Sequence, residues 1–164
     1  MVPSKLARGA LHQGMAPVAF CGEVIRGFGR GSKQLGCPTA NIPAAPYAQQ
    51  LTELPLGVYW GVASVADKVY AMALNVGWSP FFANKEKTIE IHVLAQLEDF
   101  YGENIACVAL GYIRPEANFG SVEELKQAIA DDIVYAKEQL ETPLAKHYLE
   151  KDLEWTKARQ TKQV

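Results

Sequence analysis

The feature that most constrains the fold is the order in which two hydrophobic patterns follow one another along the chain. Segments rich in β-branched and aromatic residues, the composition of strands, fill most of the chain up to about residue 113. A helical period begins only after Phe119. Because the strands come first and the helix last, alternating βαβ units are disfavoured. The expected strands cover residues 18–28, 57–65, 68–78, 87–95 and 104–113.

The close spacing of these strands indicates how they pair. Only Ala66 and Asp67 separate two of them, which is typical of a tight hairpin. The extended segment at Thr39 and Asn41 brings the number of strands to about six. Antiparallel strands that must hide their edges favour a small barrel. We therefore expect a mainly β fold, an antiparallel barrel with a C-terminal helix packed against it.

The helix has a clear start and a clear stop. Ser121 followed by Glu124 matches a capping box, and Pro143 is expected to end the helix. Its apolar face is predicted to comprise Val122, Leu125, Ile129, Ile133, Ala136 and Leu140. A second, shorter helix is expected from about Leu144 to Trp155.

The length and the two ends predict a simple domain organisation. A chain of 164 residues suits a single domain with one core. Residues 1–16 are expected to form a flexible N-terminal extension, and residues 17–164 one domain. In that domain the barrel covers about 17–115 and the helical part about 121–156. A monomer is the default expectation.

Composition excludes several classes of function. A net charge of −2 supplies no basic field for nucleic acid. Three cysteines without a C-x-x-C pair, and three scattered histidines, predict neither a disulfide framework nor a zinc site. No apolar run is long enough for a membrane span. We expect a cytoplasmic protein, with a mitochondrial location as the alternative because no acidic residue precedes Glu23.

The glycine-rich stretch GFGRGSKQLGCPTAN, residues 27–41, fits neither common phosphate-binding motif. A P-loop requires Gly-Lys before Ser or Thr, whereas here Ser32 precedes Lys33. The dinucleotide fingerprint requires a following helix, and Pro38 and Pro43 stand in a segment with no helical period. The residues alone predict a basic loop that ends in a Pro-Thr-Ala-Asn corner.

Two groups of residues could carry chemistry. Thr88, Glu90 and His92 alternate with aliphatic residues and so share one face of a strand, where Glu90 could act as a general base. The alternative is a solvated outer face of the sheet. Thr39 and Asn41 offer oxygen donors suited to Mg²⁺ bound to a nucleotide, or else they form a polar turn.

Other candidates stay open between two roles. Arg114 could bind an anion or be a surface charge. Aromatic residues near loop ends could pack in the core or form a slot for a flat ring: Trp78, Phe81, Phe82, Tyr101 and Phe119.

Taken together, these motifs resemble the riboflavin kinase family, in its single-function eukaryotic type that is not fused to an adenylyltransferase. The likeness spans about residues 18–141 and rests on RGFGRGSKQLGCPTAN, GVYWGVASV, NVGWSPFF, KTIEIHVL, EDFYGE and GYIRPEANF, in that order. It implies a six-stranded Greek-key barrel with a C-terminal helix. It also implies transfer of the γ-phosphate of ATP to the 5′-hydroxyl of riboflavin, giving FMN and ADP.

The resemblance also implies a role for individual residues. Glu90 falls on the catalytic base, and Thr39 and Asn41 on the ligands of Mg²⁺, for which Zn²⁺ or Mn²⁺ are alternatives. Residues at positions that contact ATP are Gly27, Lys33, Val93, Ala95 and Tyr101, and those that contact the flavin are Arg114 and Phe119. Ala117 departs from the family pattern, which often has a longer side chain there.

Two other functions compete with the kinase. One is a barrel that binds flavin or nucleotide without catalysis, although such a protein needs neither a metal pair nor a base. The other is a nucleic-acid-binding barrel, which would require a basic face with interleaved aromatic residues.

Overall fold

A computed structural model describes residues 15–25, 39–78, 86–95, 97 and 102–150 of the chain. These residues form six strands, two short helical turns and two C-terminal helices. The strands are β1 (Val18–Glu23), β2 (Thr39–Ile42), β3 (Gly57–Val65), β4 (Lys68–Trp78), β5 (Lys87–Val93) and β6 (Asn104–Arg114). The helical elements are η3 (Ala45–Tyr47), α1 (Ala48–Glu53), α2 (Val122–Gln139) and α3 (Pro143–Glu150).

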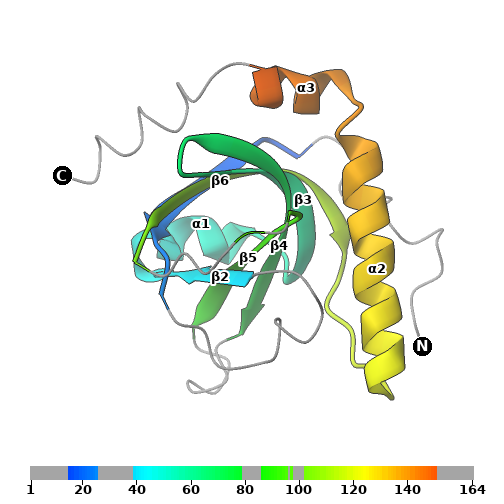
Figure 1. Cartoon of the computed structure of the whole chain (residues 1–164). Helices are drawn as coiled ribbons and strands as arrows, with labels where there is room; N and C mark the ends of the chain where they lie inside the picture. Colours follow the sequence, from blue (N-terminus) through cyan, green and yellow to red (C-terminus); the bar gives the residue numbers. More distant parts are fainter. Residues whose placement is uncertain (1–14, 26–38, 79–85, 96, 98–101, 151–164) are drawn as a thin grey trace.

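All six strands belong to one antiparallel sheet with the order β1-β6-β3-β4-β5-β2. Strands β3, β4 and β5 are consecutive neighbours and β6 returns beside β3, which is the Greek-key arrangement. The sheet curls strongly (Figure 1). Just beyond β1, Ile25 bridges Asn41 of β2, so the two ends of the sheet approach each other. The expected antiparallel barrel is confirmed.

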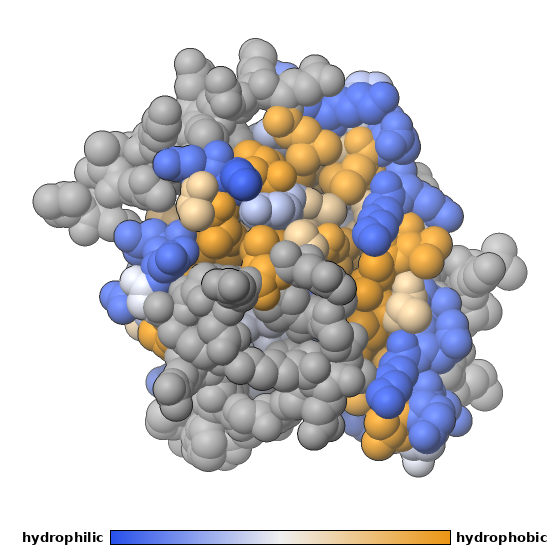
Figure 2. All heavy atoms as spheres, viewed as in Figure 1, coloured by the Kyte–Doolittle hydropathy of each residue, from blue (hydrophilic) through white to orange (hydrophobic). Residues whose placement is uncertain are grey.

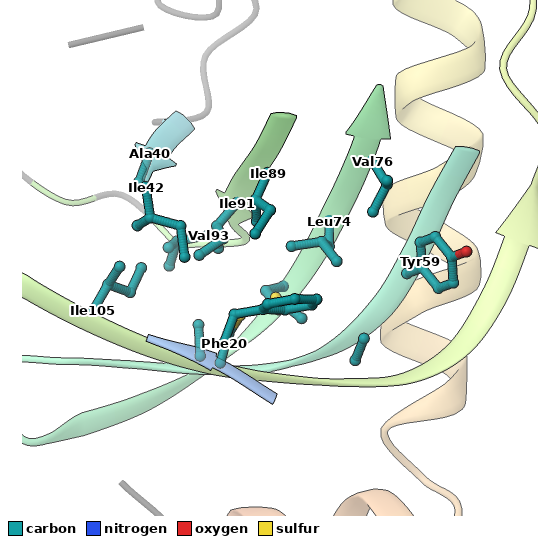
Figure 3. Close-up of a cluster of buried hydrophobic side chains, with 14 of the residues drawn as sticks. Phe20, Ala40, Ile42, Tyr59, Leu74, Val76, Ile89, Ile91, Val93 and Ile105 are labelled. Atoms are coloured by element: carbon teal, nitrogen blue, oxygen red, sulfur yellow. The ribbon is translucent and has the colours of Figure 1, made fainter. Parts of the chain in front are cut away.

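The interior of the curled sheet is filled by side chains from alternate strand positions. Figure 3 shows aliphatic residues of β2, β4 and β5 converging on Phe20 of β1. Fully buried members include Phe20, Ala40, Leu74, Ile91, Val93 and Ile105. As in other small barrels, closely packed side chains fill this interior.

A second core lies on the outside of β3 and β6. Trp60, Val62 and Ile113 pack there with Ala136 of α2 and Ala145 of α3. In Figure 1, α2 runs alongside the barrel and α3 follows at its upper end. Helix α2 begins at the predicted cap, where the Ser121 hydroxyl accepts a hydrogen bond from the Glu124 N–H at 3.2 Å.

Most expected elements are confirmed, with differences at their ends. Strands β3 and β4 have the predicted bounds, and both residues of the Ala66-Asp67 link have positive φ, as a type I′ turn requires. Strand β5 ends at Val93 rather than residue 95. The first strand ends at Glu23, and residues 26–28 lie outside the described part of the chain.

The helical regions differ more from expectation. Helix α2 ends at Gln139, and Pro143 then begins α3, because the first position of a helix needs no donated N–H bond. Val122, expected on the apolar face of α2, is 59% exposed because it lies on the first turn, at the free end of the helix. The elements η3 and α1 were not predicted. Leu51 is their only buried residue, too weak a signal for a helical period.

Candidate active site

Strand β5 separates its side chains onto two faces, as the alternating sequence predicts. Ile89, Ile91 and Val93 are buried in the barrel interior. Glu90 and His92 lie on the opposite, outer face and are partly exposed. The polar face therefore points away from the core, where a carboxylate keeps access to water and ligands.

The antiparallel register places other polar residues beside Glu90. Asn41 of β2 lies directly opposite Glu90 on one side, and Asn75 of β4 lies opposite it on the other. Thr39 is paired with His92 one step further along the same two strands. Directly opposed residues have Cβ atoms about 4.5–5.5 Å apart and share a face of the sheet. The register thus assembles a polar cluster from three strands.

The same line of opposed residues continues across the rest of the sheet. Asn75 is opposite Val58 of β3, and Val58 is opposite Arg114 of β6. Five strands thus contribute one residue each to a row, in the order Asn41, Glu90, Asn75, Val58 and Arg114. We call these five residues the cross-strand row.

A pocket of about 580 Å³ lies between this outer face and helix α2. Figure 2 shows hydrophobic side chains gathered between the barrel and α2, with hydrophilic residues along the outer side of the helix. Polar side chains in the wall come from Thr39, Asn75, Glu90, His92, Arg114, Glu116, Asn118 and Asp132. Apolar ones come from Val58, Phe119, Leu125, Ile129 and Ile133, among others. A mixed wall of this kind suits a ligand that is part flat ring and part polar chain.

Arg114 is not a surface charge. Only 5% of the residue is exposed, and its guanidinium forms an ion pair with the equally buried Asp132 of α2. Nε donates to both carboxylate oxygens at 3.0 Å, and the terminal Nη2 donates to Oδ2 at 2.8 Å. The ring of Phe119 lies 5.6 Å from the guanidinium carbon, a cation–π contact at the pocket wall. The pair ties α2 to the last strand.

The structure brings some predicted site residues together and separates others. Thr39, Glu90, Arg114 and Phe119 all line this pocket. Asn41 stands beside Glu90 in the cross-strand row but does not line the pocket.

The nucleotide candidates are placed elsewhere. The Val93 side chain is buried in the barrel interior, and Ala95 packs against that core, so neither faces the pocket. Gly27, Lys33 and Tyr101 lie outside the described residues.

Four polar pocket residues were not predicted from the sequence, namely Asn75, Glu116, Asn118 and Asp132, and two of them carry arguments below. Asp132 is four residues from each of the buried residues Ala128 and Ala136, so all three lie on the same side of α2. A carboxylate on the buried side of a predicted helix was the sequence signal that could have identified Asp132. Asn75 follows Leu74 in a strand that the sequence predicts, but its position opposite Glu90 depends on register. Register cannot be obtained from a single strand.

Thr39 and Asn41 fit a nucleotide-bound Mg²⁺. Both occupy the outer face of β2, opposite the buried Ala40 and Ile42, and both offer oxygen donors beside Glu90. Within the described ranges, no cluster of three or more His, Cys, Asp or Glu side chains is arranged to hold a metal. Two neutral oxygen ligands suit an ion whose remaining ligands are phosphate and water.

None of the helices in the described part of the chain has the length and hydropathy needed to cross a bilayer. The longest, α2, carries charged residues throughout.

Comparison with known proteins agrees with the sequence motifs. Residues 15–140 match the family model described as Flavokinase: Riboflavin kinase. The chain is 52% identical over 124 residues to a bifunctional riboflavin kinase/FMN phosphatase of Arabidopsis thaliana, covering 74% of this chain and 33% of that protein. It is 47% identical over 127 residues to the human riboflavin kinase, covering 76% of this chain and 82% of the human one.

A solved structure has the same fold. The crystal structure of riboflavin kinase from Trypanosoma brucei superposes with a TM-score of 0.69 at 24% sequence identity, covering 84% of this chain and 88% of that one. The family model covers most of the chain and the human relative is matched over most of its length. This chain therefore belongs to the riboflavin kinase family.

Proposed function

We propose that this protein transfers the γ-phosphate of ATP to the 5′-hydroxyl of riboflavin, giving FMN and ADP. The observation that carries the proposal is the position of Glu90. Glu90 lines the pocket between the barrel and α2. In the cross-strand row, Asn41 lies on one side of Glu90, and Arg114 lies at the far end of the row on the other side. A site that phosphorylates a hydroxyl requires a carboxylate beside oxygen atoms that can bind a metal ion.

Glu90 acts as the general base. It accepts the proton of the 5′-hydroxyl while the 5′-oxygen forms a bond to the γ-phosphorus. The bond from that phosphorus to the bridging oxygen breaks, and ADP leaves with its electrons. The position of Glu90 on a paired central strand fixes the carboxylate, and such positioning is worth more in phosphoryl transfer than covalent participation.

Thr39 and Asn41 would hold Mg²⁺ together with the phosphates. Bound there, the ion neutralises charge that develops on the phosphoryl oxygens. We assign Gly27 and Lys33 to the loop that covers the nucleotide, and Val93, Ala95 and Tyr101 to its binding site. Because the Val93 side chain is buried in the core, its contact is assigned to the backbone.

Arg114 and Phe119 are assigned to the flavin. Both border the pocket beside Leu125 and Ile129 of α2, which offer an apolar surface to a ring. The ion pair with Asp132 holds Arg114 in place, so its contact with a ligand needs no further ordering of the side chain. Ala117 contributes only a methyl group to this wall.

We assign the activity to residues 17–164 as a single domain that works as a monomer, because one chain supplies the whole described pocket. We also propose a cytoplasmic location, as the sequence predicts.

The experiment incubates the protein with riboflavin, ATP and Mg²⁺ and separates FMN by chromatography. Glu90→Gln keeps the shape of the side chain but cannot accept the proton, so we expect FMN formation to fall about a hundredfold. Glu138→Gln, an exposed change on α2, is the matched control and should keep full activity.

Two results would change the proposal. A wild-type protein that quenches flavin fluorescence but makes no FMN would be a binding barrel and not a kinase. A Glu90→Gln protein with unchanged turnover would keep the reaction and refute the role of the base.

A further inference from the structure

Asn75 is a partly exposed polar residue of the pocket whose side-chain oxygen has no hydrogen-bond partner among the described residues. Its side-chain oxygen Oδ1 is shielded from solvent and accepts no hydrogen bond within the described structure. A buried acceptor left without a donor costs stability, and a native structure that keeps one usually serves a ligand or an ordered water. Asn75 is one of the residues that line the pocket containing Glu90.

The position of Asn75 in the cross-strand row indicates which part of a substrate it meets. Glu90 is its direct neighbour on β5, and Val58 its direct neighbour on β3. The row spans four interstrand steps, about 19 Å in all. The proposed phosphate end is at Asn41 and the proposed ring end is at Arg114, so Asn75 lies between the reacting hydroxyl and the ring.

We infer that Asn75 binds the ribityl chain of riboflavin by accepting a hydrogen bond from a hydroxyl one or two carbons away from the reacting 5′-hydroxyl. This inference rests on the proposed function and names a substrate contact within the same site. The amide oxygen accepts only, so the partner must be a donor. A polyol chain offers such donors in succession, and while one hydroxyl bonds to Glu90 an adjacent one reaches the neighbouring strand.

The contact has a consequence for specificity. A site that presents an unpaired acceptor rejects a ligand that lacks the matching hydroxyl, because the acceptor then remains buried and unsatisfied. Asn75 should therefore select for an intact polyol chain, whereas Arg114 and Phe119 contact the ring. It should also hold the 5′-hydroxyl against Glu90 by fixing the carbon chain behind it.

The test pairs variants with substrate analogues that each lack one ribityl hydroxyl, the 2′-, 3′- and 4′-deoxy flavins. Asn75→Leu keeps the approximate size of the side chain and removes the acceptor. Flavin affinity is measured by fluorescence quenching in the presence of Mg-ADP, which needs no turnover. Asn104→Leu, an exposed asparagine at the start of β6, is the matched control.

We expect Asn75→Leu to bind riboflavin about fivefold to tenfold more weakly, the effect of one lost hydrogen bond. Wild type should lose a similar factor with either the 3′- or the 4′-deoxy flavin. Asn75→Leu should show no further loss with that one analogue, while the other analogues still weaken its binding. Such non-additivity identifies the two partners of one contact. The control should bind every flavin as wild type does.

Equal losses with all three analogues would mean that Asn75 shapes the pocket without touching a hydroxyl, and would overturn the inference. Unchanged affinity for riboflavin would mean that water alone serves Oδ1, and would overturn it too. Asn75→Ala repeats the comparison if the leucine variant does not fold. Because binding is read without catalysis, a wild type that makes no FMN would refute the proposed function and leave this contact testable.

Discussion

The hydroxyl of Tyr47 completes the free edge of strand β1. It accepts a hydrogen bond from the Cys21 N–H and donates one to the Cys21 carbonyl oxygen, both at 2.8 Å. The ring packs edge-on against Phe20 with centroids 5.0 Å apart. Strand β1 ends the sheet order, so none of the described strands pairs with these backbone groups on that side. One side chain thus replaces a neighbouring strand at this point.

Burial, and then the contact with Cys21, raise the pKa of Tyr47 from 10.0 to about 12. The folded state therefore favours the protonated hydroxyl. Its contribution to stability is fully present below pH 10 and is lost as the pH rises through 12.

Tyr47→Phe should lower the free energy of unfolding by about 1–2 kcal/mol at pH 8, because the Cys21 N–H loses its acceptor. Between pH 10 and 11.5 the wild type should lose stability more steeply than the variant. Urea unfolding of both proteins across this range measures the difference. Burial also raises the pKa values of Tyr59 and Tyr112. Both residues are present in wild type and variant, so their contributions to the pH dependence cancel in the comparison. Parallel pH profiles would contradict this assignment.

Helix α2 is held to the barrel by a buried charge pair as well as by apolar contacts. Asp132 and Arg114 are each about 95% buried, and the two residues are 18 positions apart in sequence. Removing one partner of such a pair leaves the other charge buried without compensation. The same pair forms part of the pocket wall, so its loss should affect both stability and flavin binding.

Asp132→Asn should cost about 3–5 kcal/mol of stability by the usual effect of breaking a buried pair, and should raise the KM for riboflavin. The control is Asp131→Asn. The Asp131 carboxylate accepts a hydrogen bond from Gln127 on the exposed side of α2, and its replacement should cost less than about 1 kcal/mol of stability. The double variant Arg114→Met, Asp132→Leu should recover much of the stability but not the flavin affinity. Thermal unfolding and KM measurements separate the two effects, and equal stability of both single variants would refute the role of the pair.

At the scale of elements, the sequence predicts what is local. Strands β3 and β4 and the start of α2 have their expected bounds because enrichment in β-branched and aromatic residues, the two-residue link and the Ser121 cap are short-range signals. The helix α1 has only six residues and one buried side chain, so it gives no periodic signal. The pocket was not predictable in detail, because its wall combines the register of five strands with the docking of α2. Family motifs identified Glu90 and Arg114, yet the partner Asp132 required the folded chain.

For the molecule as a whole, the site lies across nearly the full width of the curled sheet, from β2 to β6. Ligands that occupy both ends of the cross-strand row therefore contact strands that are far apart in the sequence. A ligand that binds only the folded state raises stability by mass action, by about 2.7 kcal/mol at a hundred times its Kd. Binding should consequently be visible as a rise in the melting temperature.

Riboflavin and Mg-ADP, each at a hundred times its Kd, should each raise the melting temperature by about 5–10 °C, and together by more than either alone. A chelator such as EDTA should remove the increment due to Mg-ADP and leave that due to riboflavin, because only the nucleotide is assigned a metal. Differential scanning calorimetry measures both increments. Glu90→Gln should retain them, since the base is needed for turnover more than for binding. A nucleotide increment that survives chelation would contradict the proposed metal ligands.

The alternation along β5 also bears on how such a protein can change over generations. In this strand of seven residues, neighbouring residues contribute alternately to stability and to the active site. Ile89 and Ile91 fill the interior, whereas Glu90 borders the pocket. Substitutions can thus adjust thermal adaptation and substrate choice independently within one short segment. A deletion or insertion of one residue before Glu90 would not be tolerated in the same way, because it would turn the carboxylate inward and an isoleucine outward. Lineages should therefore vary this strand by replacement and keep its length constant.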